Sequence, residues 1–88
     1  MGDQSTGFRI RDAAAFQVQS SRDGSTWIPR QPAPDGIGTM RHGGDYWFTD
    51  HHQAWVAANT LRNALTWSEV RVIAKGHNGD IVGEQVIL

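Results

Sequence analysis

The sequence contains no cysteine among its 88 residues. This absence excludes disulfide bonds, thiolate zinc sites and cysteine nucleophiles, and it fits a cytoplasmic protein in a reducing compartment. A chain of this length buries only about 60–65% of the surface that its unfolded state exposes, so its core is small. We therefore expect self-association to supply additional stability.

An excess of charge of one sign is also lacking, because eight basic and nine acidic residues give a net charge of -1. Nonspecific binding of duplex nucleic acid needs a basic surface, so this balance counts against such a partner. No apolar run approaches the ~20 residues of a membrane span, and we expect no membrane association. We expect residues 1–7 to form a flexible N-terminus before a single domain over residues 8–88.

The first third of the domain has the pattern of an antiparallel hairpin. Residues 8–20 alternate between apolar and polar side chains in two patches, which is typical of a half-buried strand. Residues 12–15 interrupt this alternation, and we expect a bulge or a bend there. The Asp-Gly pair at 23–24 is typical of a hairpin turn. A second short strand should begin at Trp27 and stop at Pro29, because proline cannot donate to a β-ladder.

The clearest expected element is a helix over residues 51–65. Asp50 is a typical N-cap residue, and Gln53 occupies the position of its capping-box partner. At 100° per residue, the apolar side chains of this segment form one stripe, which we expect to face a sheet. The stripe consists of Ala54, Ala57, Ala58, Leu61, Ala64 and Leu65.

Two further strand patterns, at 69–75 and 80–88, flank the Asn-Gly pair at 78–79. This pair favours a type I′ turn, in which both central residues have positive φ. Residues 39–48 predict one more short strand, most clearly over 46–48. The resulting order predicts an α+β fold, in which a small antiparallel sheet of four to five strands packs on one helix.

Three of the four histidines lie in one segment, HGGDYWFTDHHQAW, at residues 42–55, together with two aspartates, a tyrosine and two tryptophans. A metal site requires ligands that converge, but His51 and His52 are adjacent and point about 100° apart on a helix. We therefore expect no metal, no cofactor and no catalytic residue. The simplest interpretation is structural, with a glycine turn at 43–44 and a helix cap at Asp50.

The same segment also has the composition of a binding surface. Trp55 lies beside the core stripe of the helix, with His51 and Arg62 on the same side, and such clusters are common in interface hot spots. The start of the helix offers unpaired N–H groups, which favour a small anionic or aromatic ligand as an alternative partner. The predicted partner-binding residues are Arg41, His42, Asp45, Tyr46, Trp47, His51, Trp55 and Arg62.

These features favour a small non-enzymatic binding module that occludes a protein partner or sequesters a ligand, as accessory inhibitors of phages and mobile elements do. We also expect a homo-oligomer, because the apolar residues 86–88 would form an edge strand that invites pairing.

Two other classes of function remain as alternatives. The first is a small hydrolase that uses His42, Asp45 and His51 for acid–base chemistry, with or without a metal. The second is a sheet-based binder of single-stranded nucleic acid that uses Arg9, Arg11 and the tryptophans. The near-neutral charge of the chain counts against this second alternative.

Overall fold

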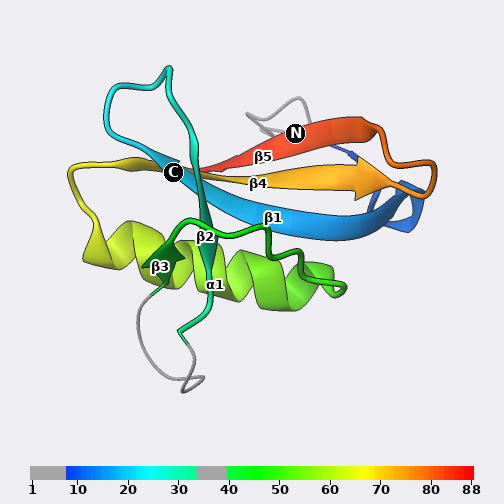
Figure 1. Ribbon diagram of the computed structural model, residues 1–88, viewed down its shortest axis with the longest axis horizontal. Coiled ribbons are helices and arrows are strands. Elements are labelled where there is room, and N and C mark those ends of the chain that lie inside the picture. Colours follow the sequence, from blue (N-terminus) through cyan, green and yellow to red (C-terminus); the bar gives the residue numbers. More distant parts are fainter. Residues whose placement is uncertain (1–7, 34–39) are drawn as a thin grey trace.

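A computed structural model describes residues 8–33 and 40–88 of the chain. In these described residues, five antiparallel strands form one sheet in the order β3-β2-β1-β4-β5, and a single α-helix, α1, lies across one face of it (Figure 1). This arrangement confirms the predicted α+β fold. The prediction of a flexible segment at residues 1–7 lies outside the described residues. The elements are β1 (Ala13–Ser21), β2 (Ile28–Gln31), β3 (Arg41–His42), α1 (His51–Ala64), β4 (Glu69–Gly76) and β5 (Ile81–Ile87).

The central strand, β1, pairs with β2 on one side and with β4 on the other. Its register with β4 shifts between Ala13 and Ala15, which confirms an irregularity where a bulge or a bend was expected, at residues 12–15. The prediction that the strand begins at Phe8 is wrong. The Asp12 amide donates to the carbonyl of Arg9, and this bond closes a short 3₁₀ turn instead of a strand.

The prediction that Pro29 stops the second strand is also wrong, because β2 continues to Gln31. Pro29 lies opposite Gln19 in the ladder with β1, and its carbonyl accepts from the Gly43 amide at 3.0 Å. The nitrogen and carbonyl of a strand residue point to the same side. The missing N–H of Pro29 therefore faces the short β3 and costs no hydrogen bond to β1.

The loop between β1 and β2 is held by Asp23. Its carboxylate accepts from the amides of Thr26 and Ser25 and from the Ser21 hydroxyl. These three bonds, led by that from Thr26, lower the pKa of Asp23 below its ordinary value of 3.8. Gly24 follows with φ +79°, so the expected turn at residues 23–24 is confirmed.

The loop between β4 and β5 differs from the predicted type I′ turn. Of the two central residues only Gly79, with φ +93°, lies in the positive region, whereas Asn78 does not. The Asn78 side-chain oxygen instead accepts from the Asp80 amide at 3.1 Å. This local bond holds the turn without a left-handed asparagine.

Helix α1 begins at the predicted cap. The Asp50 carboxylate accepts from the Gln53 amide at 3.1 Å, and the helix continues to Ala64. We expect Asp50→Ala to lower the free energy of unfolding by about 0.5–2 kcal/mol, because one N–H of the first turn loses its acceptor. Urea denaturation measures this loss. Asp50→Asn is the matched control and should retain most of the stability; equal stability of all three proteins would contradict the capping role.

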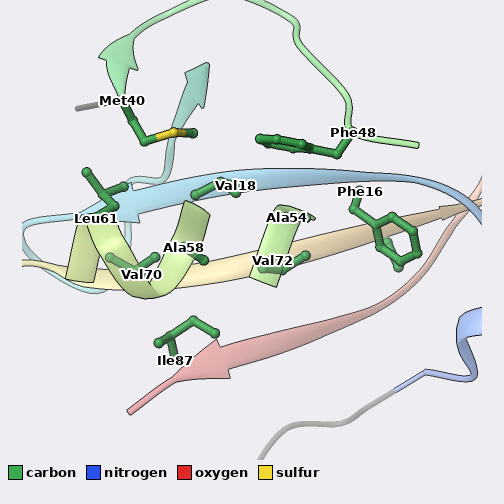
Figure 2. Close-up of a cluster of buried hydrophobic side chains, with 11 residues drawn as sticks. Phe16, Val18, Met40, Phe48, Ala54, Ala58, Leu61, Val70, Val72 and Ile87 are labelled. Carbon is green, nitrogen blue, oxygen red and sulfur yellow. The ribbon is translucent and has the colours of Figure 1, made fainter. Parts of the chain in front are cut away.

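The core lies between α1 and the sheet, where Ala54, Ala58 and Leu61 of the helix lie against Val70 and Val72 of β4 (Figure 2). Both alanines are fully buried, and their small side chains allow the helix to approach the strands closely. The predicted helix stripe is correct except at its end, because Ala64 is exposed. Helix α1 has 14 residues, and no helix within the described parts of the chain is long and apolar enough to cross a membrane.

Candidate functional site

The predicted binding segment does not form one surface. Arg41 and His42 are exposed in β3, and Asp45 and Tyr46 are exposed in the loop that follows. The short strand predicted within residues 39–48 is present as β3, but it lies at Arg41–His42 and not at 46–48, where the chain forms only a single bridge between Phe48 and Phe16. The side chains of the segment are therefore distributed over the sheet edge, the core and the helix.

His51 belongs to the margin of the core. Its ring packs edge-on against Phe16 and Phe8, with centroid distances of 5.2 and 5.8 Å. Its Nε2 atom lies 3.2 Å from the side-chain oxygen of Gln85 in β5. His51 therefore joins the first turn of the helix to the sheet, and this position removes it from the predicted surface cluster with Trp55.

Trp55 is 41% exposed on α1, next to the exposed Val56. Its aromatic neighbour is His52, whose ring stacks on it at 6.4 Å, and not His51. Arg62 is half-buried two turns further along the helix. Trp55 is therefore exposed on the helix flank, as predicted, but the predicted cluster with His51 is absent.

The residues of the hydrolase alternative are likewise separated. His42 lies in β3, Asp45 accepts a hydrogen bond from the Trp47 indole at 3.2 Å, and His51 packs at the core margin. Within residues 8–33 and 40–88 no group of three or more His, Asp or Glu side chains is placed to hold a metal ion. The three side chains of the hydrolase alternative therefore do not meet at one centre for acid–base chemistry.

The sheet face opposite α1 contains a different candidate site. Because side chains alternate along a strand, residues that lie between the core positions of β1 and β4 point away from the helix. They form the floor of a groove with a volume of about 510 Å³, which is within the usual range for small-molecule sites. The groove is lined by Gln17, Gln19, Trp47, Arg71, Ile73, Ile81, Gly83 and Glu84.

A directed chain of hydrogen bonds crosses the floor of this groove. The Arg71 Nε–H donates to the Gln19 side-chain oxygen at 2.9 Å, and the Gln19 amide nitrogen donates to the Gln17 oxygen at 2.7 Å. Arginine can only donate, so it determines how both glutamine amides are oriented. The chain therefore ends in the amide NH₂ of Gln17, which donates to no other group within the described residues.

Arg71 is the centre of this network. Its Nη1–H donates to the Glu84 carboxylate at 2.7 Å, and its guanidinium lies 4.1 Å from the centroid of the Trp27 ring. A planar guanidinium suits such simultaneous contacts, whereas a lysine ammonium does not. The floor of the groove is therefore ordered before any ligand binds.

Trp47 forms a wall of the groove because of the bridge between Phe48 and Phe16. The bridge directs Phe48 into the core, and the side chain one residue earlier points to the opposite face. The indole N–H donates to Asp45, and the Lys75 ammonium lies 4.3 Å from the ring centroid. These two contacts restrict the orientation of the ring.

The charges around the groove cancel. Arg71 and Lys75 supply two positive charges, and Glu84 and Asp45 supply two negative ones. The groove thus combines apolar walls with polar groups and has no net charge.

The sequence prediction included Trp47 but missed the rest of the groove. The missing signal was strand alternation, because Gln17 and Gln19 alternate with the core residues of β1, and Arg71 and Ile73 alternate with those of β4. Until the pairing of β1 with β4 is known, the polar positions Gln17, Gln19 and Arg71 have the pattern of an ordinary solvated strand face.

Comparison of the chain with protein-family models, curated proteins and solved structures returned no match.

Proposed function

We propose that the chain is a small non-enzymatic binding module that sequesters a small molecule in the groove on the open face of its sheet. The proposal keeps the class of function expected from the sequence. It moves the binding surface from the loop and helix flank to residues such as Gln17, Trp47 and Arg71. The size of the groove supports a small-molecule ligand in place of an occluded protein partner.

The observation that carries the proposal is the hydrogen-bond network from Arg71 through Gln19 to Gln17. Gln17 is only 4% exposed, although its amide lines the groove. The Gln17 NH₂ group is not among the buried side-chain atoms that lack a hydrogen-bond partner, so it is a donor that the open groove leaves accessible. A ligand that accepts from this NH₂ group would gain a hydrogen bond, and the ordered network would lower the entropic cost of its binding.

A fragment screen by saturation-transfer NMR tests this function with paired variants. We expect fragments that bind the wild-type protein to lose binding in Trp47→Ala, because the wall of the groove is removed. Trp55→Ala removes another half-exposed tryptophan, on the helix, and should leave binding unchanged. Both variants should unfold within a few degrees of the wild type.

A second variant separates loss of binding from loss of fold. Ile81 is 57% exposed at the side of the groove, so Ile81→Arg should block the groove without disturbing the core. Binding that survives both Trp47→Ala and Ile81→Arg would contradict the proposal. Loss of binding in Trp55→Ala alone would place the ligand on the helix flank instead.

We further propose that the chain self-associates through β5. This strand forms one edge of the sheet and, among the described residues, pairs only with β4. Ile87 is buried in the core, but Ile81, Val82 and Leu88 are exposed along this edge. Unprotected apolar edges favour pairing with another strand. Light scattering at micromolar concentration should therefore give at least a dimer mass, and a strict monomer would contradict this proposal.

A further inference from the structure

Three groove residues form one row across the sheet. Gln17 of β1 lies opposite Ile73 of β4, and Ile73 lies opposite Glu84 of β5. Neighbouring strands are 4.7–4.9 Å apart, so the backbones of Gln17 and Glu84 are separated by about 10 Å. One planar ring with a hydrogen bond of about 2.9 Å at each side fits this span.

The two ends of the row have opposite hydrogen-bonding character. The chain that starts at Arg71 orients the Gln17 amide so that its NH₂ group is the free end, and this group can only donate. The Glu84 carboxylate uses Oε1 for Arg71, and its second oxygen can only accept. A ligand that spans the row must therefore carry an acceptor on one side and a donor on the other.

The middle of the row is apolar. Ile73 is buried between the two polar ends, Trp47 forms a wall, and Ile81 contributes an exposed apolar side chain. Because the four charges around the groove cancel, an uncharged ligand has no unbalanced charge to oppose it. The same balance disfavours a phosphate-bearing polymer, which needs excess positive charge.

We propose that the groove binds an uncharged planar cyclic amide as a free small molecule. A ring carbonyl accepts from the Gln17 amide, a ring N–H donates to the Glu84 carboxylate, and the flat ring lies over Ile73. This assignment rests on the function proposed above and adds the chemical class of the ligand.

Uracil is the probe, since it carries both groups on one ring. NMR titration of the ¹⁵N-labelled protein should show saturable binding with a Kd on the order of 1 mM, as expected for so small a ligand. Shifts should include the Gln17 side-chain amide. 1,3-Dimethyluracil keeps the carbonyls but lacks the N–H groups, and it should bind roughly tenfold more weakly or not at all.

Two nearly isosteric substitutions test the direction of the bonds. Gln17→Glu removes the donor and Glu84→Gln removes the acceptor, and each should weaken uracil binding roughly tenfold. The double variant exchanges the positions of the donor and the acceptor at the two ends of the row, so the ligand ring can bind in the opposite orientation. Recovery of binding in the double variant is the expected result. The buried carboxylate that Gln17→Glu introduces could prevent folding. In that case Glu84→Gln and 1,3-dimethyluracil still test the proposal.

Equal binding of uracil and 1,3-dimethyluracil would overturn the proposal. If other fragments, such as benzoate, bind in the groove and uracil does not, the proposal of a cyclic amide is also overturned. That result would leave the proposed small-molecule function intact. Failure of every fragment to bind the groove would overturn both. Tighter binding of a thymidine decanucleotide than of uracil would overturn the assignment to a free small molecule.

Discussion

Phe16→Ala is expected to lower the free energy of unfolding by about 3–5 kcal/mol, because it removes a buried aromatic ring and leaves a cavity. The ring is 2% exposed and packs against Phe8 and His51, with centroid distances of 5.9 and 5.2 Å. Small domains are stable by only about 5–15 kcal/mol, so the variant should lose much of its stability. Urea denaturation monitored by circular dichroism measures the change.

Tyr46→Ala is the matched control for this substitution. Its ring also packs edge-on against a core phenylalanine, Phe48, at 4.9 Å, but Tyr46 is exposed. Tyr46→Ala should lower the free energy of unfolding by about 1 kcal/mol. A loss of less than about 1 kcal/mol in Phe16→Ala would mean that the contact between β1 and the start of α1 is not part of the core.

Arg71→Met is expected to lower the free energy of unfolding by about 1.5–3 kcal/mol, because it removes charged hydrogen bonds to Gln19 and Glu84 while keeping an apolar stem. The ion pair with Glu84 is partly exposed, so it should contribute less than about 1 kcal/mol of this. A double-mutant cycle with Glu84→Gln, followed by urea denaturation, separates that contribution from the rest.

Arg22→Met is the matched control, since Arg22 also lies over a tryptophan ring, that of Trp67 at 4.8 Å, but at an exposed position. Its loss should change stability by no more than about 0.5 kcal/mol. Equal effects of the two substitutions would show that the Arg71 network does not order the groove.

The helix and the two hairpins could be predicted from the sequence because their signals are local. Asp50 caps the helix through its own side chain, and glycines at positions 24 and 79 supply the positive φ that the turns need. The errors arose where long-range pairing overrides local preference. Pro29 is tolerated in β2 only because its nitrogen faces away from β1.

The candidate site was harder to predict for the same reason. Trp47 is on the open face because Phe48 pairs with Phe16, and these two residues are far apart in the sequence. Gln17 and Glu84 become the two ends of one row only when β4 lies between β1 and β5. Periodicity reveals which side chains share a strand face, but not which strands are neighbours.

The central claim is that the open face of the sheet, and not the loop or the outer flank of α1, is the binding surface. The most direct test is to map backbone amide shifts of the ¹⁵N-labelled protein on addition of any fragment that binds it. The shifts should concentrate in β1, β4 and β5 and on the Trp47 indole. Shifts confined to α1 around Trp55, or to Arg41 and His42, would contradict it.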